Sequence, residues 1–167
     1  MAISENERLR AEISGWVAEY ASDRGALLPV LQRIQKKYRM ISDSAMQCVA
    51  DAFGIHPVEV HGVVSFYSFL DWTPKGRFIV RLCQTISCEM QGKAAVAAAL
   101  EKALGIPFGE TTADGLFTLE HANCLGMCDH SPAMLVNDQV FSSLTPDKAV
   151  EVIEGCRNAA ANAAAAV

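Results

Sequence analysis

Hydrophobic residues recur at helical spacing through about the first 72 residues of the chain. The stripe of the first predicted helix is Leu9, Ile13, Trp16, Val17 and Tyr20. Ser4 and Glu7 stand at capping-box spacing before it, and each can satisfy an unpaired backbone donor of the other. Three more short helices are predicted, from about Leu27 to Tyr38, from Ser42 to Gly54 and from His56 to Tyr67. The first part of the chain is therefore predicted to be a small helical bundle.

The pattern changes after the turn-rich segment 73–76. Residues 77–82 are rich in strand-forming side chains and predict a β-strand that leads directly into Cys83. The alanine-rich segment 94–104 then predicts a helix that ends at Gly105, and residues 116–120 predict a second strand. Because a crossover helix joins these two strands, we expect them to be parallel.

Three further segments complete the predicted second half. Residues 133–136 and 140–143 flank a short turn and predict a hairpin of antiparallel strands. A last helix should start at Thr145 and continue to about Arg157. The remaining segment, 158–167, is mostly alanine with little to bury, so we expect it to be a frayed, flexible tail.

These elements predict an α+β protein built from two domains. Residues 1–74 would form the helical bundle, and residues 75–157 would form a thioredoxin-like α/β domain with the order β-α-β-β-β-α. Ligands of open α/β sheets lie beyond the carboxyl ends of the strands. The functional site is therefore expected at that edge of the second domain.

Charge and length exclude several classes of protein. The net charge of −5 at pH 7 argues against a nucleic-acid partner. No segment approaches the roughly 18 consecutive apolar residues of a membrane span, so we expect no direct membrane contact. The amino-terminal segment lacks the apolar core of a secretory signal. We therefore expect a cytoplasmic protein that reaches a membrane only through a larger complex.

Cysteines carry the chemistry of this sequence. Four of the six form two close pairs, Cys83-x₄-Cys88 and Cys124-x₃-Cys128, and each pair follows the end of a predicted strand. Clustered cysteines in a reducing compartment are typical of metal ligands or redox groups. If the two pairs meet at one sheet edge, they form a single site with four thiolates. Cys48 and Cys156 lie alone in predicted helices, where small buried side chains are expected.

Spacing alone leaves the content of this site open. Four thiolates can hold zinc or an iron–sulfur cluster, and we favour the cluster because the flanking strands and helices already supply a core. A dithiol redox protein is a minor alternative, since the sequence has no C-x-x-C motif. His121 and His130 lie near the second pair, and with four thiols present we expect neither to be a ligand.

An aromatic cluster near the end of the helical part is a candidate interface. Four aromatic residues stand within seven positions: Phe66, Tyr67, Phe69 and Trp72. A single core-facing stripe cannot accommodate all of them. We therefore expect some to be exposed on the isolated chain and to contact a partner protein.

Several segments resemble a known family. They are Leu27-Leu-Pro-Val-Leu-Gln-x-Ile-Gln35, Val58-Glu-Val-His-Gly-Val-x-Ser-Phe-Tyr67, Cys83-x₄-Cys88 with Gly92, and Cys124-Leu-Gly-Met-Cys128 with Pro132-Ala-Met134 and Val136-Asn137. In this order they resemble the small [2Fe–2S] subunit of NADH dehydrogenases, which is thioredoxin-like. Related subunits of NAD-linked hydrogenases and formate dehydrogenases have the same pattern.

The resemblance implies that Cys83, Cys88, Cys124 and Cys128 ligate one [2Fe–2S] cluster. It further implies an electron-transfer subunit without catalytic residues of its own, which exchanges single electrons with the FMN of a partner. That partner would be an FMN- and NADH-binding flavoprotein subunit, on which residues 1–74 would dock. A larger iron–sulfur subunit of a hydrogenase, a formate dehydrogenase or complex I would complete the assembly.

Two other functions remain as alternatives. One is a free-standing [2Fe–2S] thioredoxin-like ferredoxin that acts as a carrier, and the other is a zinc-stapled interaction module without redox function. The chain has no G-x-G-x-x-G fingerprint and no P-loop. FMN and NAD(H) are therefore expected in the partner subunit and not in this chain.

Overall fold

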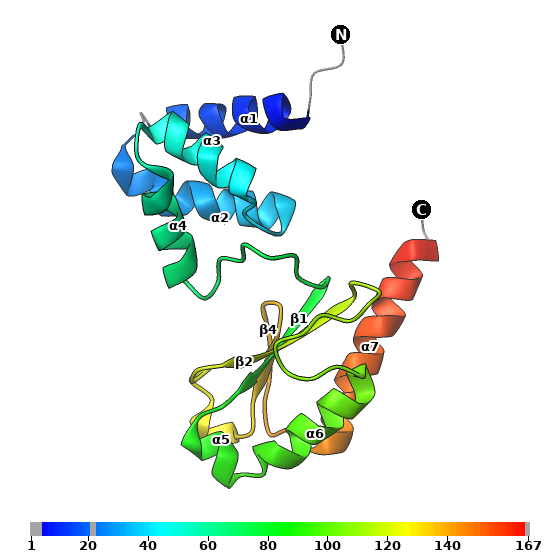
Figure 1. Cartoon of the computed structure of the whole chain (residues 1–167). Helices are drawn as coiled ribbons and strands as arrows, with labels where there is room; N and C mark the ends of the chain where they lie inside the picture. Colours follow the sequence, from blue (N-terminus) through cyan, green and yellow to red (C-terminus); the bar gives the residue numbers. More distant parts are fainter. Residues whose placement is uncertain (1–4, 21–22, 166–167) are drawn as a thin grey trace. The chain divides into compact units, whose positions relative to one another are not determined.

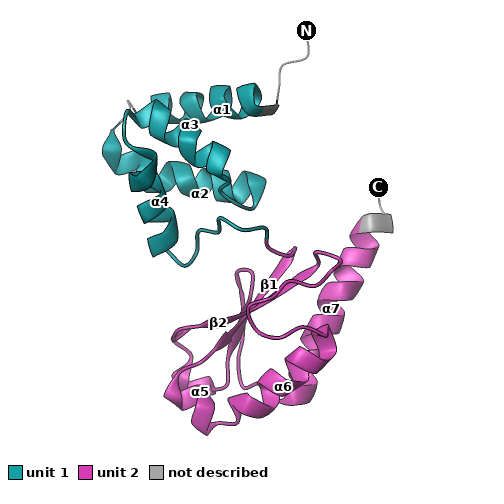
Figure 2. Ribbon diagram, in the orientation of Figure 1, with its two compact units in different colours: residues 1–74 teal, residues 75–167 magenta. Residues whose placement is uncertain are grey.

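The chain folds into two compact units, residues 1–74 and 75–167 (Figures 1 and 2). The structure is a computed structural model, and it describes residues 5–20 and 23–165. Ser4 of the predicted capping box lies outside the described residues. Within the described ranges, no helix combines the length and the apolar character needed to cross a lipid bilayer.

Unit 1 (residues 1–74) is helical, as its sequence pattern predicts. Its elements are α1 (Glu5–Glu19), the short 3₁₀ helix η1 (Arg24–Ala26), α2 (Leu27–Tyr38), α3 (Asp43–Phe53) and α4 (Pro57–Phe66). Ser42 caps α3 by accepting a hydrogen bond from the backbone N–H of Ala45, and Gly54 ends that helix in the left-handed conformation.

The core of unit 1 comes from the apolar stripes of these helices. Ile13, Leu31, Ile34, Val49 and Val60 are each fully buried in it. The segment after α4 is tied to this core by a reciprocal pair of bonds, because Gln35 donates to the Asp71 carboxylate and accepts from the Asp71 backbone N–H.

Unit 2 (residues 75–167) is an α/β domain with a mixed sheet. Its strands are β1 (Phe78–Cys83), β2 (Phe117–Ala122), β3 (Met134–Val136) and β4 (Gln139–Phe141). The sheet order is β2-β1-β3-β4, in which β1 and β2 are parallel while β3 is antiparallel to both β1 and β4. The expected parallel pair and the expected hairpin are both confirmed.

The helices of unit 2 are α5 (Ile86–Met90), α6 (Lys93–Leu104) and α7 (Pro146–Ala165). A further 3₁₀ turn, η2, spans Cys128–His130. Helices α6 and α7 pack together, and their apolar residues share one core with Val80, Leu82, Phe117, Leu119 and Met134 of the sheet (Figure 1).

Two expectations for this unit are wrong. The segment between Cys83 and Gly92 is not only a loop, because α5 forms there and carries Cys88. The last helix does not end near Arg157 but continues through Ala165, and Ala160 is 8% exposed. Alanine has the highest intrinsic helix propensity, so the run extends the helix with little buried area.

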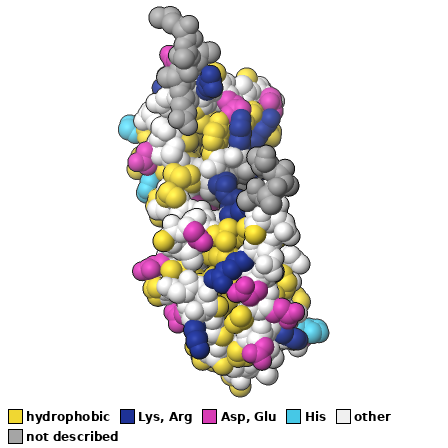
Figure 3. Space-filling model, turned by 90° about the vertical axis from the view of Figure 1, so that its right-hand side faces the viewer, with side chains coloured by type: hydrophobic (Ala, Val, Ile, Leu, Met, Phe, Trp, Pro, Cys, Tyr) yellow, Lys and Arg dark blue, Asp and Glu magenta, His cyan; other side chains and the backbone are white. Residues whose placement is uncertain are grey.

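The surface of the chain mixes both signs of charge. On the face shown in Figure 3, lysine and arginine side chains are interspersed with acidic side chains and with hydrophobic ones. Several of these charges form ion pairs, such as Lys75 and Arg81 with Glu120 on the sheet of unit 2.

Candidate metal centre

The parallel pairing of β1 and β2 brings both cysteine pairs to one edge of the sheet. Cys83 is the last residue of β1 and lies in register with Ala122, the last residue of β2. Cys124 follows two residues later in the chain. The Gln84 N–H donates to the Ala122 carbonyl at 2.9 Å, so pairing continues beyond the two strand ends.

The first pair, Cys83 and Cys88, is buried. Their exposed fractions are 2% and 1%. Helix α5 positions Cys88, and Thr85 at its N-cap places a hydroxyl 3.2 Å from the Cys83 sulfur. Burial opposes ionisation of Cys83, but the hydroxyl and the N–H of Thr85, together with contacts from Cys88 and the Leu125 N–H, hold its pKa below the ordinary value.

The second pair, Cys124 and Cys128, is exposed. The two sulfur atoms are 3.4 Å apart, at either end of a tight loop. Gly126 turns this loop with φ of +78°, and its N–H lies 3.4 Å from the Cys124 sulfur. The hydrogen bond with Cys124, and the negative charge that Cys124 acquires on ionisation, raise the pKa of Cys128.

Contacts across the site connect the two pairs. The Leu125 N–H of the second loop donates to the Cys83 sulfur, and the Ser87 hydroxyl of the first segment bonds the Cys128 sulfur. Ser131 lies 3.7 Å from the Cys88 sulfur and donates to the Cys128 carbonyl at 2.9 Å. The four predicted thiols therefore belong to one site.

The arrangement of these thiols fits a two-iron cluster. Among the described residues, no three histidine, cysteine or acidic side chains are positioned around the centre of a single ion. The cysteines lie instead as two pairs of adjacent sulfurs, and an all-cysteine [2Fe–2S] cluster uses four thiolates, two on each iron. Peptide N–H groups and hydroxyls already contact the sulfurs, as is usual around ligands of a metal site.

Nearby charges and histidines are engaged by other partners. Glu89 pairs with Lys93 at 2.9 Å, and Asp129 pairs with His130 at 2.8 Å. His121 stacks on Phe108, with ring centroids 4.0 Å apart. The N–H of Gly92, which we expected near a sulfur, donates instead to the Glu89 carbonyl.

The other two cysteines lie outside the site. Cys48 is 5% exposed in the core of unit 1. Cys156 packs half-buried against the core of unit 2, and burial raises the pKa of its thiol. Sequence reasoning missed Thr85, Ser87 and Ser131, and the only signal for them was hydroxyl residues within three positions of a cysteine.

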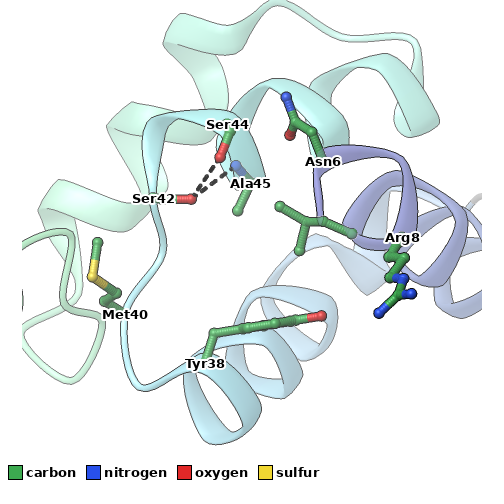
Figure 4. Close-up of a pocket in the computed structure, with 8 residues that line it drawn as sticks. Asn6, Arg8, Tyr38, Met40, Ser42, Ser44 and Ala45 are labelled. Carbon is green, nitrogen blue, oxygen red and sulfur yellow. Dashed lines mark hydrogen bonds between the residues drawn. The ribbon is translucent and has the colours of Figure 1, made fainter. Parts of the chain in front are cut away.

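A hollow of about 540 Å³ in unit 1 is separate from this chemistry (Figure 4). It lies between the start of α1 and the connection from α2 to α3, and Arg8, Tyr38 and Ser44 are among the residues that line it. Its described lining includes no cysteine. Ser42 at its margin accepts from the Ala45 N–H at 3.2 Å and so acts as a helix cap.

Exposed aromatic residues gather after α4 in unit 1, as predicted. The exposed fractions are 78% for Phe66, 45% for Phe69 and 46% for Trp72, while Tyr67 packs against the core. Val58 at the start of α4 is 68% exposed. We call Val58, Phe66, Phe69 and Trp72 the aromatic patch.

Known proteins resemble the chain over most of its length. The family model of the thioredoxin-like [2Fe–2S] ferredoxins matches residues 13–157. One subunit of the NADH-quinone oxidoreductase of Escherichia coli (strain K12) is 36% identical over 154 residues, which cover 92% of this chain and 90% of the relative. The subunit of the same name in Pseudomonas aeruginosa is 36% identical over 152 residues, which cover 91% of this chain and 90% of the relative.

A solved structure agrees with this match. An NAD⁺-reducing [NiFe]-hydrogenase in the air-oxidised state superposes with a TM-score of 0.70 at 26% identity, over 80% of this chain and 23% of the hydrogenase chain. The expected α+β fold and the expected resemblance are thereby confirmed. The chain belongs to the family of thioredoxin-like [2Fe–2S] ferredoxins.

Proposed function

We propose that this chain is the electron-transfer subunit of an NADH-oxidising complex and that it exchanges single electrons with the FMN of a partner subunit. As a member of its family it carries one [2Fe–2S] cluster. The proposal assigns Cys83, Cys88, Cys124 and Cys128 as the four ligands. It rests on one observation, that the fold joins two thiol pairs at the carboxyl edge of two parallel strands.

The residues around the thiols are suited to holding a cluster and tuning its potential. A bound [2Fe–2S] cluster accepts and returns one electron at a time, so it complements a two-electron donor only through a flavin. The buried pair keeps water from one side of the site, while the exposed pair brings the other side to the protein surface. The N–H groups of Leu125 and Gly126 place positive dipoles against the sulfurs and favour added negative charge.

The proposed partner is a flavoprotein subunit that binds FMN and NAD(H). The relatives are subunits of NADH-quinone oxidoreductases, and the similar solved structure is an NAD⁺-reducing hydrogenase, so NAD(H) chemistry is common to both. The aromatic patch offers unit 1 a surface for docking on such a subunit. An NADH-quinone oxidoreductase is our first choice for the assembly, because those relatives match over nearly their whole length. A hydrogenase or a formate dehydrogenase assembly is the second.

Two measurements test this proposal. The full chain, reconstituted anaerobically, should contain two irons and two acid-labile sulfides, be red-brown when oxidised, and give an EPR signal after one-electron reduction. NADH should not reduce the chain alone, but it should do so when the flavoprotein that co-purifies with the chain is added. Bound zinc without colour, or direct reduction by NADH, would contradict the proposal.

A further inference from the structure

Ser131 is the side chain that joins the segment of the first cysteine pair to that of the second. Its Oγ lies 3.7 Å from the Cys88 sulfur and 2.9 Å from the Cys128 carbonyl oxygen. Cys88 is almost fully buried, and Ser131 is half-buried, so water competes little for the space between them. The hydroxyl therefore contacts one proposed ligand directly and the backbone of another.

The backbone around Ser131 is fixed on both sides. The His130 carbonyl accepts from the Ser143 N–H at 2.6 Å, and the Pro132 carbonyl accepts from the Leu144 N–H at 3.0 Å. The Ala133 carbonyl accepts from the Cys83 N–H at 3.1 Å, which ties the segment to the end of β1. Ser131 thus has a defined position relative to Cys88, and only rotation of its hydroxyl remains free.

Two acceptors compete for the single hydroxyl proton of Ser131. Without a metal, the Cys88 thiol can itself donate to Ser131, and the hydroxyl proton goes to the Cys128 carbonyl. A cysteine that ligates iron has lost its proton. The only hydrogen available between these two atoms is then that of Ser131, and a more negative sulfur attracts it more strongly.

We propose that the Ser131 hydroxyl donates a hydrogen bond to the Cys88 sulfur and raises the reduction potential of the cluster. This inference rests on the ligand set of the proposed function. One electron, supplied by a reduced flavin in the complex or by dithionite in a titration, enters the site and no proton is transferred. The proton stays on Ser131 and turns from the Cys128 carbonyl towards Cys88. Hydrogen bonds to cluster sulfurs are among the factors that set such potentials.

The test is a redox titration of the reconstituted full chain, followed by visible absorption and EPR. Ser131→Ala should make reduction about tenfold less favourable, a potential lower by about 59 mV for a one-electron couple. Ser131→Thr keeps the hydroxyl and should stay close to the wild type. The shift between wild type and alanine should be equal at neutral and mildly alkaline pH, since the hydroxyl keeps its proton.

Ser65→Ala is the matched control. The Ser65 hydroxyl also donates to a carbonyl three residues earlier, that of Gly62 at 3.2 Å, but it lies in unit 1. Its removal should leave the potential unchanged. An unshifted potential in Ser131→Ala, or a shift that depends on pH, would overturn the inference.

The remaining outcomes separate this inference from the proposed function. A wild-type chain that binds no [2Fe–2S] cluster contradicts the proposed function itself. If Ser131→Ala fails to bind a cluster, Ser131→Thr decides: a potential close to the wild type supports the inference. A drop in Ser131→Thr as large as that expected for alanine overturns it.

Discussion

The two units of this chain differ in where they leave reactive or apolar groups unburied. Unit 1 buries its single cysteine, Cys48, and exposes aromatic side chains after α4. Unit 2 buries its aromatic Phe117 in the core and exposes the sulfurs of Cys124 and Cys128 at a sheet edge. Recognition of a partner and storage of an electron are therefore assigned to separate cores. Each should be removable without loss of the other, and substitutions confined to one unit can test that separation.

The largest effect is expected from the cysteines of unit 2. Cys124→Ser should abolish or severely reduce cluster binding, because one iron loses a thiolate ligand. Iron content, visible absorption and EPR measure the loss. Cys48→Ala and Cys156→Ala are the controls and should keep the cluster. A normal spectrum in Cys124→Ser would show that the ligand assignment is wrong.

A steric change should next destabilise unit 2 alone. A Cβ at Gly76 would lie 2.5 Å from the backbone carbonyl carbon of Phe117, so Gly76→Ala forces β2 to shift. We expect a loss of about 2–3 kcal/mol in the free energy of unfolding of unit 2. Denaturant unfolding followed by far-UV circular dichroism should then show two separate transitions.

Matched glycines in both units provide the controls for this change. Gly155 in α7 and Gly62 in α4 have nothing within 4 Å of a built Cβ. Alanine there should be neutral or add up to about 1 kcal/mol of helix stability. If Gly76→Ala lowered the stability of both units equally, they would not be independent cores.

The aromatic patch should affect only binding of the partner. Trp72→Ala removes an exposed aromatic side chain, and interface tryptophans often contribute strongly to affinity. We expect roughly tenfold weaker binding to the flavoprotein, measured by titration calorimetry, and an unchanged cluster spectrum. Tyr20→Ala, which removes an exposed aromatic outside the patch, should bind as tightly as the wild type. Equal weakening by both substitutions would contradict the proposed docking surface.

The smallest effect concerns the pH dependence of unit 1. Hydrogen bonds from Lys37 and then Tyr38 lower the pKa of Glu12 in the folded chain. The stability that this carboxylate contributes is present above its ordinary pKa and is lost as pH falls through the lowered value. Glu12→Gln should therefore flatten the acid limb of the stability curve of unit 1 while leaving unit 2 unchanged. An acid limb identical to the wild type would show that the ionised carboxylate contributes nothing there.

Much of the fold could be predicted because local signals agreed with tertiary structure. Ser42 and Gly54 bracket α3 as capping rules require, and the crossover between β1 and β2 made their parallel pairing predictable. The end of α7 was missed because the tail buries little, although the propensity of its alanines extends the helix. Helix α5 was missed because five residues give too short a pattern to detect.

The candidate site was predictable in its residues and not in its contacts. Spacing alone marked the four cysteines, because two pairs after two parallel strands must meet at one edge. That Leu125 bonds Cys83 and Ser131 contacts Cys88 depends on how the loops cross, which no periodicity encodes. The different burial of the two pairs likewise follows from α5 covering only the first.

The pairing of β1 with β2 also dictates an order of maturation. The chain contains half of its proposed ligands before α6 has been synthesised and the other half only after β2. Neither half is a complete site, so a ribosome-bound chain that has not passed Cys128 cannot retain the cofactor. Cluster insertion must therefore be a late, post-translational event, and a chain whose sheet fails to close remains colourless and can be distinguished from mature protein.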